Sequence, residues 1–446
     1  MSPVPSEPVA LSCTACNRKA CTNRSPPSPS PTPPPVQPVT FEDVSTAMYR
    51  IRDGIVRTPC LRSHFLSELC QADIYLKQEF TQFTGSFKER GARNALMKLT
   101  AEEKRRGVIA ASAGNHALAL AWHGRQMGIP VTVCMPVLAP MTKVSKCKVF
   151  GANVVQHGMH IIEAKDHAQS APEFEGMKYI NGYDHPDIIA GAGTMGMEIL
   201  EQVPNVEVVV VPVGGAGLIA GIALAVKTLR PDVKVIGVEP EFCPSYTAAL
   251  EAITTPTLAD GLAVPMVGHN AFAVAKNLVD SVHLVTERCV ALAVLRLVEM
   301  EKYVVEGGGC AGLAALLPGG SLDIASLKGK KIVVPLCGGN IDVPVLGRVI
   351  DRGLAADSRL VRFITPVSDR PGGIATLARI ISDSGGSIRD IYHERAWLHT
   401  HMDQVQIKCV VEVTGKDHQQ LLHDNLESAG FSLIWGKASS NSVDAW

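Results

Sequence analysis

The chain has 446 residues, of which 46% are hydrophobic, 19% are charged and 5% are aromatic. This composition is typical of a globular protein with an ample core and excludes fibrous and wholly disordered proteins. The 42 Lys and Arg residues nearly balance the 43 Asp and Glu residues, so the chain lacks the basic excess typical of nucleic-acid binding. Its length predicts two or three domains of about 150 residues each. The twelve cysteines, spread over such a length, are expected to be reduced and mostly buried.

Residues 1–40 differ from the rest of the chain because they contain eleven of the 29 prolines. Such a segment buries too little apolar surface to offset its ordering entropy, which predicts a disordered tail. Cys13, Cys16 and Cys21 lie in this tail, where loose thiols are a better interpretation than a zinc site without a second ligand pair. The tail also lacks the basic-then-apolar order of a secretory signal. We therefore expect a soluble, cytoplasmic protein that does not enter a membrane, and organelle targeting by the tail stays open.

Residues 41–350 alternate between short β-branched runs and Ala-rich stretches, which predicts an α/β fold with helices on both faces of a parallel sheet. Ligands in such folds bind outside the carboxyl ends of the strands. The uncharged stretch 208–226 approaches the length of a membrane span, but its central glycines favour a strand, a loop and a helix over Leu218–Leu229. The predicted strands are Asp73–Leu76, Val108–Ala111, Val131–Met135, Val208–Val213, Val233–Val238 and Lys331–Leu336.

The pattern changes again near residue 355. Six predicted elements follow in the order β-α-β-β-α-β, which is the ferredoxin-like arrangement. The boundary between the domains is expected at Asp351–Ser358, with the second domain covering residues 359–437. The six elements are Val361–Pro366, Ile374–Ser384, Ser387–Glu394, Val405–Val413, His418–Ala429 and Phe431–Trp435.

A lysine follows a glycine turn in the segment Ser86–Ala92, which is predicted to open a helix after Gly85. Lys88 could be an ordinary solvated surface charge. A helix N-terminus disfavours the ammonium form, however, and so would help to supply a neutral, nucleophilic amine. Both interpretations are open on this motif alone.

Three further motifs follow predicted strands. The segment Ser112–His116 begins a helix and suits a carboxylate ligand, although Ser112 or Asn115 could also act as an ordinary helix cap. The segment Gly214–Leu218 suits a phosphate, because small residues let the backbone wrap it, or forms a tight turn. Cys337, in Cys337-Gly338-Gly339-Asn340, would by itself be read as an inert core thiol.

Together and in this order, the four motifs resemble the fold-type II enzymes that use pyridoxal 5′-phosphate, and most closely the threonine/serine dehydratases. The resemblance covers residues 41–350 and implies a two-lobed, parallel-sheet core similar to the tryptophan synthase β subunit. It implies that Lys88 is the Schiff-base lysine, that Phe87 packs against the cofactor ring and that Asn115 bonds the ring hydroxyl. It also implies a pyridine nitrogen facing Cys337. The residues implied for the phosphate are Gly214, Gly215, Ala216, Gly217 and Leu218, and those for the substrate carboxylate are Ser112, Ala113, Gly114, Asn115 and His116.

The resemblance implies elimination of the β-hydroxyl from L-threonine, giving 2-oxobutanoate and ammonia, and the same reaction on L-serine, giving pyruvate. The cofactor would act as an electron sink at Cα, and Lys88 would remove the α-proton. A neutral Cys337 would not hold the ring nitrogen protonated, which favours prompt elimination. The sequence does not rank threonine against serine.

Two departures discriminate within the family. Serine racemases carry a second serine where this chain has Ala113, and that hydroxyl is their acid/base on the opposite face of the substrate. Some relatives bind a metal through two acids six residues apart, whereas here Glu239 is followed at that spacing by Ser245. We therefore predict no metal site and a hydrogen-bonding role for Glu239. Racemisation, β-replacement and a non-catalytic amino-acid sensor are the alternative functions.

The C-terminal region resembles ACT-type regulatory domains, which bind amino acids between paired copies. The segment Asp369–Ile374 lies between its first strand and helix, and the loop Arg370–Ile374 within it is the expected contact. A dimerisation module without a ligand is the alternative, because a fold does not determine a function. We expect a homo-oligomer with a small-molecule amino-acid substrate, and the regulatory interpretation adds an amino-acid effector.

Overall fold

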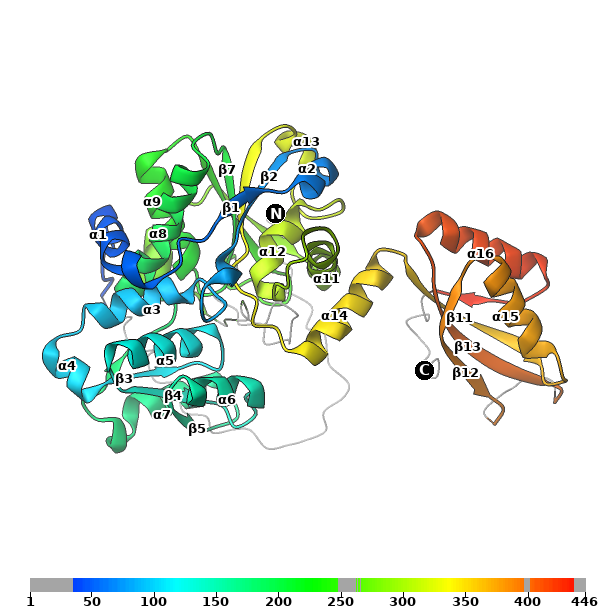
Figure 1. Cartoon of the computed structure of the whole chain (residues 1–446), viewed down its shortest axis with the longest axis horizontal. Coiled ribbons are helices and arrows are strands. Elements are labelled where there is room, and N and C mark those ends of the chain that lie inside the picture. Colours follow the sequence, from blue (N-terminus) through cyan, green and yellow to red (C-terminus); the bar gives the residue numbers. More distant parts are fainter. Residues whose placement is uncertain (1–34, 248–261, 263, 265, 397–401, 437–446) are drawn as a thin grey trace, which may run out of the picture. The chain divides into compact units, whose positions relative to one another are not determined.

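Figure 1 shows the computed structural model of the chain, which describes residues 35–247, 262, 264, 266–396 and 402–436. Most of the predicted disordered tail, with Cys13, Cys16 and Cys21, lies outside the described residues. The first helix, α1 (Phe41–Ile51), begins where that tail was predicted to end. The Thr40 side chain accepts from the Asp43 N–H, and the Asp43 carboxylate accepts from the Thr40 N–H, which closes a capping box.

A large sheet forms the centre of the catalytic region, with the strand order β1-β2-β10-β7-β8-β9. All neighbours are parallel except β1, which runs antiparallel to β2. The side chains of β7 alternate between two hydrophobic clusters: Val208 and Val210 join one, and Val209 and Val211 join the other. This explains the unbroken apolar run, since a strand covered by helices on both sides has no solvent face. The strands are β1 (Cys60–Arg62), β2 (Asp73–Lys77), β7 (Val208–Pro212), β8 (Lys234–Pro240), β9 (Ser281–Val285) and β10 (Lys331–Pro335).

Helices from distant parts of the chain cover this sheet, and most of them follow a strand, as expected for parallel α/β units (Figure 1). The predicted stretch 208–226 divides into β7, a glycine loop and α9, as expected. None of the helices in the described part of the chain is long and apolar enough to cross a membrane. The helices are α2 (His64–Cys70), α8 (Pro186–Gln202), α9 (Gly217–Leu229), α10 (His269–Ala275), α11 (Glu287–Arg296), α12 (Gly307–Leu316), α13 (Ile324–Leu327) and α14 (Val343–Ala356).

A second, smaller parallel sheet has the order β5-β4-β3-β6 and its own hydrophobic clusters. Its two central strands have the predicted bounds. Two sheets in one catalytic region confirm the predicted two-lobed α/β core. The elements are β3 (Val108–Ala111), β4 (Val131–Met135), β5 (Asn153–Gln156), β6 (Lys178–Tyr179), α3 (Lys88–Met97), α4 (Ala101–Arg106), α5 (Asn115–Met127), α6 (Met141–Val149) and α7 (Ile161–Ser170).

The C-terminal region forms an antiparallel sheet in the order β12-β13-β11-β14, with a hydrophobic cluster of its own. The predicted last strand, Phe431–Trp435, is shortened to two residues because Gly430 (φ +86°) and Phe431 still close the preceding helix. Its elements are β11 (Leu360–Ser368), α15 (Gly373–Asp383), β12 (Ser387–Glu394), β13 (Gln404–Glu412), α16 (Lys416–Ser428) and β14 (Ile434–Trp435).

The expected boundary at Asp351–Ser358 contains the end of α14, which continues to Ala356. Gly353 lets this helix approach α11 closely: a Cβ at Gly353 would lie 2.9 Å from the Ala291 carbonyl oxygen. Arg288 also donates to the Ala356 carbonyl at 2.7 Å. These contacts hold the last turns of α14 against α11.

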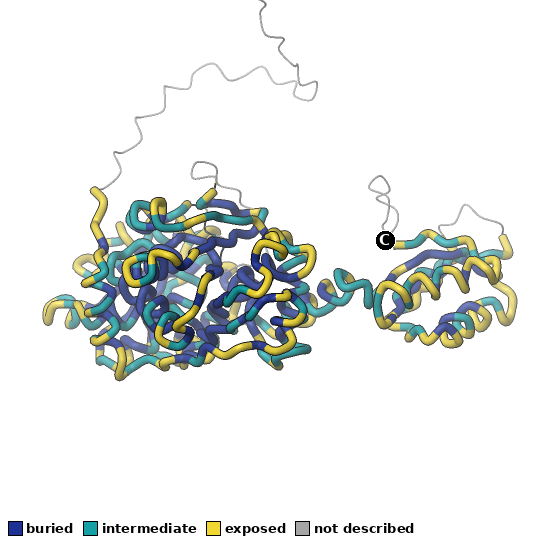
Figure 2. The backbone as a smooth tube through the Cα atoms, turned by 90° about the horizontal axis from the view of Figure 1, so that it is seen from above, coloured by how far each residue is buried: buried dark blue, intermediate teal, exposed yellow. Residues whose placement is uncertain are grey.

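The buried residues concentrate within the strands and the helices packed on them (Figure 2). The nine cysteines in the described part of the chain are all free, and all but Cys289 are buried. For these nine, the expectation of reduced and mostly buried thiols is confirmed.

Candidate active site

The lysine motif and the Cys337 motif meet through a short antiparallel pairing, although they lie far apart in the chain. Ser86 forms a β-bridge with Gly338. The Phe87 N–H donates to the Cys337 carbonyl at 3.0 Å, and the Gly339 N–H donates to the Gly85 carbonyl at 2.9 Å. Because Cys337 follows β10 directly, this pairing places the start of α3 at the carboxyl edge of the large sheet, where ligands of α/β folds bind.

Lys88 is the first residue of α3, as predicted, and its side chain is half-buried rather than solvated. Its Nζ donates to the Gly182 carbonyl at 2.6 Å and lies 5.0 Å from the centroid of the Phe87 ring. Burial lowers the pKa of Lys88 to about 8, and nearby Cys337 and Glu306 only partly oppose this shift. Among the described residues, no carboxylate forms an ion pair with Lys88. A substantial fraction of this amine is therefore neutral and nucleophilic near pH 8.

Asn115 begins α5, but neither it nor Ser112 caps the helix through its side chain, so the alternative of an ordinary cap does not hold. Instead, Asn115 Nδ2 donates to Glu306 Oε1 at 2.6 Å. Its Oδ1 accepts from Asn340 Nδ2 at 2.9 Å. Ser112 Oγ accepts from the Gly114 N–H at 3.3 Å, which shapes the loop ahead of the helix. The side-chain amide of Asn115 is thus held in place by Glu306 and Asn340, which are distant from it in the sequence.

His116 is buried, with 4% of its surface exposed. Its Nε2 donates to the Ile180 carbonyl at 3.1 Å, and its Nδ1 has no partner in the part of the chain that the structure describes. Burial, reinforced by the charge of Lys88, lowers the pKa of His116 to about 3, so the ring is neutral at all physiological pH values. A Cβ at Gly182 would lie 2.7 Å from this ring. His116 therefore packs against the backbone of Gly182, whose carbonyl accepts the hydrogen bond from Lys88.

The predicted phosphate loop connects β7 to α9 and has a backbone that few sequences adopt. Ala216 has a φ of +68° and precedes the helix, which begins at Gly217. A Cβ at Gly217 would lie 2.1 Å from the Tyr183 carbonyl oxygen, and one at Gly215 would lie 2.3 Å from the Tyr183 ring. Only small residues allow this approach. The loop presents backbone N–H groups at the start of a 13-residue helix, which suits an anion.

Residues 181–184 link this loop to the lysine, because Gly182 holds Lys88 and Tyr183 packs on the glycines. Asn181 Oδ1 accepts from the backbone N–H groups of Tyr183 and Asp184 at 2.9 and 3.0 Å, which makes the turn rigid. The sequence analysis missed this segment. Its only local signal is the turn-forming pair Asn181-Gly182.

Cys337 and Glu239 have the chemical states expected from the sequence. Burial raises the pKa of the Cys337 thiol well above its usual value, so the group is neutral. Glu239 accepts from the Tyr246 N–H at 2.6 Å and from the Thr247 N–H and hydroxyl at 3.0 and 2.6 Å. Both carboxylate oxygens are thus occupied, which confirms the hydrogen-bonding role predicted for Glu239. Ser245 Oγ lies 3.5 Å from the Gly214 carbonyl oxygen, beside the glycine loop.

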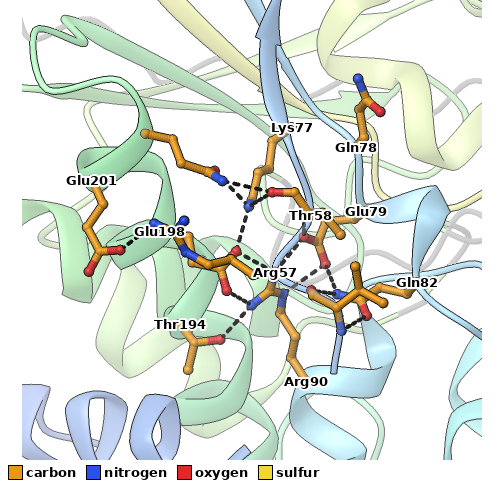
Figure 3. Close-up of polar contacts among 12 residues, drawn as sticks. Arg57, Thr58, Lys77, Gln78, Glu79, Gln82, Arg90, Thr194, Glu198 and Glu201 are labelled. Atoms are coloured by element: carbon orange, nitrogen blue, oxygen red, sulfur yellow. Dashed lines mark hydrogen bonds and ion pairs between the residues drawn. The ribbon is translucent and has the colours of Figure 1, made fainter. Parts of the chain in front are cut away.

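A cluster of buried charges anchors the other face of α3 (Figure 3). Arg90 donates to Glu79 at 2.7 and 2.8 Å and to Glu198 at 2.7 and 2.9 Å. Lys77 Nζ donates to Glu198 at 2.5 Å and to the Thr58 carbonyl at 2.7 Å. The side chains of these four ionic residues are at most 5% exposed. Arg90 follows Lys88 by two positions, so this cluster holds the helix that carries the reactive amine. The sequence analysis did not identify it.

Glu306 and Asn340 were also not assigned as site residues. Glu306 is 7% exposed and precedes three consecutive glycines at the start of α12, which is the signal that could have drawn attention to it. Asn340 follows the Cys337 motif and bonds both Asn115 and the Thr84 carbonyl, the latter at 2.7 Å. Nothing local in the sequence predicts that these side chains meet Asn115.

These residues fit pyridoxal phosphate on structural grounds. Residues 181–184 contact both the buried amine of Lys88 and the glycine-lined start of α9. The site also contains buried polar atoms that have no hydrogen-bond partner among the described residues: Thr84 Oγ1, Ser86 Oγ and His116 Nδ1. Unpaired polar atoms are costly in a protein interior and indicate a place where a polar ligand binds.

Comparisons with known proteins agree with this site. An L-threonine ammonia-lyase of Thermotoga maritima is 40% identical over 401 residues, which cover 89% of this chain and 99% of that protein. The catabolic L-threonine dehydratase of Escherichia coli K12 is 40% identical over 318 residues, covering 70% and 96%.

Solved structures give the same result. The processed form of threonine deaminase isoform 2 from Solanum lycopersicum matches with a TM-score of 0.67 and 32% identity, covering 71% of this chain and 90% of that one. The serine racemase of Dictyostelium discoideum matches with a TM-score of 0.64 and 33% identity, covering 68% and 99%. Residues 51–338 match the model of the pyridoxal-phosphate dependent enzyme family. The chain therefore belongs to the family of pyridoxal-phosphate dependent enzymes, which it shares with L-threonine ammonia-lyases.

Proposed function

We propose that this protein is an L-threonine ammonia-lyase, which converts L-threonine to 2-oxobutanoate and ammonia and also converts L-serine to pyruvate. The observation that carries the proposal is Lys88, an amine with a pKa near 8 at the edge of the large sheet, linked through residues 181–184 to a glycine-lined helix start. The 40% identity to an L-threonine ammonia-lyase over nearly the whole chain supports the choice of reaction.

We assign the cofactor contacts as follows. Lys88 would hold the aldehyde carbon of the cofactor covalently, and the N–H groups of residues 214–218 would hold its phosphate. Phe87 would pack against the ring, and Asn115 would donate to the ring hydroxyl. Cys337 would lie near the ring nitrogen as a neutral thiol that does not keep this nitrogen protonated.

When bound, pyridoxal phosphate accepts the electron pair left at Cα after proton removal. The Lys88 amine removes the Cα proton, because its lowered pKa keeps part of it neutral. The backbone N–H groups of residues 112–116 bind the substrate carboxylate, since they lie at the start of a 13-residue helix. His116 is neutral and buried, so it adds no charge to this subsite. The β-hydroxyl takes up a proton and leaves as water, and hydrolysis of the released enamine gives the 2-oxo acid and ammonia.

Racemisation is the second candidate, because serine racemases have a similar fold. Ala113 weighs against it, since a methyl group cannot exchange a proton with the far side of Cα. The motif Ser112-Ala113-Gly114-Asn115-His116 weighs against β-replacement, and a lysine with a lowered pKa weighs against a non-catalytic sensor.

We further propose that residues 359–437 form an ACT-like regulatory or dimerisation domain, in a cytoplasmic homo-oligomer. Gly372 has a φ of +101° and precedes α15, so the loop Asp369–Ile374 can bring backbone N–H groups to a carboxylate. Arg395 holds Asp369 through hydrogen bonds of 2.8 to 3.2 Å, which orders the start of this loop.

The test is the release of 2-oxobutanoate from L-threonine and of pyruvate from L-serine by the purified holoenzyme. Borohydride reduction followed by peptide mapping should place the cofactor on Lys88. A protein that carries the cofactor on Lys88 but releases neither 2-oxo acid is not an ammonia-lyase. Formation of D-serine without pyruvate would establish the racemase instead.

A further inference from the structure

We infer that Glu306 and Asn340 are positioning residues that lock the side-chain amide of Asn115, so that its Nδ2 and not its Oδ1 faces the ring hydroxyl of the cofactor. This inference rests on the cofactor contacts proposed above. It concerns how the chain makes one of those contacts directional, and it assigns functions to two residues that are distant from Asn115 in sequence.

The two partners have opposite hydrogen-bonding characters. Asn115 Nδ2 faces the carboxylate of Glu306 at 2.6 Å, and a carboxylate accepts hydrogen bonds. Asn115 Oδ1 faces the amide nitrogen of Asn340 at 2.9 Å, and that nitrogen donates. A rotation of the Asn115 amide by 180° would bring oxygen against carboxylate and nitrogen against nitrogen. Both contacts would then be repulsive, so only one orientation is stable.

The Asn340 amide is itself oriented, which makes the chain of contacts directional. Its Nδ2 also donates to the Thr84 backbone carbonyl at 2.7 Å, and a backbone carbonyl can only accept. The backbone of Glu306 is held as well, because its N–H donates to the Gly338 carbonyl at 2.9 Å. The backbone carbonyls of Thr84 and Gly338 therefore fix Asn340 and Glu306, which are the two residues that orient the Asn115 amide.

Two glycines make room for this arrangement. A Cβ at Gly338 would lie 2.5 Å from Glu306 Oε1 and 3.0 Å from Asn115 Nδ2. Gly85 has a φ of +80°, and a Cβ there would lie 2.9 Å from Asn340 Oδ1. Gly85 lies in the turn before Lys88, and Gly338 follows Cys337. The two glycines thus leave room for the hydrogen bonds of Asn115 with Glu306 and Asn340, and they also shape the backbone next to Lys88.

The consequence for the cofactor concerns the second Nδ2 hydrogen of Asn115. One hydrogen is engaged by Glu306, which leaves the other to donate to the ring oxygen. An amide polarised by a carboxylate on one hydrogen and by a donor on its oxygen is held without rotational freedom, and the contact it makes is correspondingly well defined. Glu306 is buried, with 7% of its surface exposed, so its hydrogen bond to Asn115 is little weakened by solvent.

The test compares four variants of the full-length holoenzyme. Glu306→Gln can still accept from Asn115, whereas Glu306→Ala cannot. Asn340→Ala removes the donor, and Asn340→Asp replaces it with an acceptor that repels Asn115 Oδ1. Glu301→Gln is the matched control, because Glu301 is a nearby acid that bonds Ser63 instead.

The readouts are the dissociation constant of pyridoxal phosphate, the visible absorption and circular-dichroism bands of the bound cofactor, and the pH titration of those bands. We expect Glu306→Ala and Asn340→Asp to raise the dissociation constant about tenfold, to shift the titration and to weaken the dichroic band. Glu306→Gln should restore most of the wild-type signal, and Glu301→Gln should match the wild type. Thermal melting of each variant separates these effects from loss of folding, and Asn340→Asp provides the test should Glu306→Ala not fold.

A double-mutant cycle decides whether Glu306 acts through Asn115. In the Asn115→Ala background, the further change Glu306→Ala should alter neither the cofactor bands nor the dissociation constant. Full additivity of the two changes would overturn the inference while leaving the proposed function intact. A wild-type protein that does not carry the cofactor on Lys88 would overturn the proposed function, and this inference with it.

Discussion

Two clusters of polar residues lie next to the first turns of α3, and they differ in whether a buried charge has an ion-pair partner. The ionic cluster comprises Lys77, Glu79, Arg90 and Glu198, and each buried charge in it has an opposite charge within hydrogen-bonding distance. The lysine cluster comprises Lys88, Gly182, Asn115, Glu306 and Asn340, and its amine is bound to a neutral backbone carbonyl.

The pKa values show what this difference does. Burial alone would lower the pKa of Arg90, but Glu79 and Glu198 more than offset it and raise the value. Burial would raise the pKa of Glu79, but Arg90 and Lys77 lower it. Both groups therefore stay charged. Burial lowers the pKa of Lys88 to about 8, because the nearby Cys337 and Glu306 offset the loss of hydration only in part. The paired charges thus keep Arg90 and Glu79 ionised, whereas burial of the Lys88 amine without an ion pair among the described residues favours its neutral, nucleophilic form.

The geometry of a helix separates the two clusters. Lys88 and Arg90 are two positions apart, which corresponds to a rotation of about 200° around the helix axis. Their side chains therefore leave opposite faces of α3. One face carries the reactive amine and the other is anchored by ion pairs, so the helix can hold the amine rigidly. Each of the following predictions tests one side of this comparison.

The largest effect is expected for Lys88→Ala. The variant loses both the covalent anchor of the cofactor and the proposed base, so turnover of L-threonine should fall by at least about 10³-fold. The measurement is 2-oxobutanoate release under saturating substrate. The thermal melting of the apoprotein should stay close to that of the wild type, since Lys88 has no ion pair to lose. Rapid multiple turnover by a folded variant would disprove the role of Lys88.

Removal of the central cation from the ionic cluster should instead destabilise the fold. Arg90→Ala leaves Glu79 and Glu198 buried with too little positive charge, which should cost about 3–5 kcal/mol in the free energy of unfolding. Urea unfolding measures this loss.

Arg57→Ala is the matched control, because Arg57 pairs with Glu201 on the exposed edge of the same region (Figure 3). It should cost about 1 kcal/mol or less. Equal losses in the two variants would contradict the distinction between paired burial and surface pairing.

The lowered pKa of Lys88 should be visible in the capture of the cofactor by the apoprotein. Only the neutral amine attacks an aldehyde, so the rate of capture should rise as the pH passes about 8, instead of the ordinary lysine value of 10.5. A folded-state pKa below the unfolded value also means that the amine opposes folding at low pH, and that this cost disappears as the pH rises from about 8 to 10.5. Stopped-flow absorbance gives the pH profile. A midpoint near 10.5 would contradict desolvation of Lys88.

A smaller effect is expected for Ala113→Ser. The new hydroxyl would place an acid/base on the far side of the substrate Cα, which should permit a low rate of L-serine racemisation. Chiral chromatography of the products detects D-serine, with the wild-type protein as the baseline. The absence of D-serine above that baseline would count against the stereochemical argument.

Removal of the residues after Asp357 should have the smallest effect on basal turnover. Neither cluster contains a residue beyond Asn340, and the C-terminal sheet has a hydrophobic core of its own. The truncated chain should keep L-threonine turnover and lose any response of the intact enzyme to isoleucine or valine. No response of the intact enzyme to any natural amino acid would leave the domain as an assembly device.

The local patterns of the sequence predicted much of the architecture. β3, β4 and β12 have the predicted bounds. Each is a short run of residues with high β-strand propensity, and turn or helix signals mark both of its ends. The chemistry-bearing motifs around Lys88, Asn115, Gly214–Leu218 and Cys337 were also identified, since each follows a strand at an edge where ligands bind. Their contacts with a cofactor and substrate stay predictions.

The sequence by itself determined the features that depend on neighbouring residues: the alternating elements, the glycine turns and the position of Lys88 at a helix start. Only the tertiary structure decided which distant side chains complete them. Asn115 and Glu306 are 191 positions apart, and Lys77 and Glu198 are 121 apart. The physical reason is that a local sequence pattern predicts a single acid or amide to be a solvent-exposed surface residue. Its burial and its partner are set by the packing of strands and helices that no local window contains.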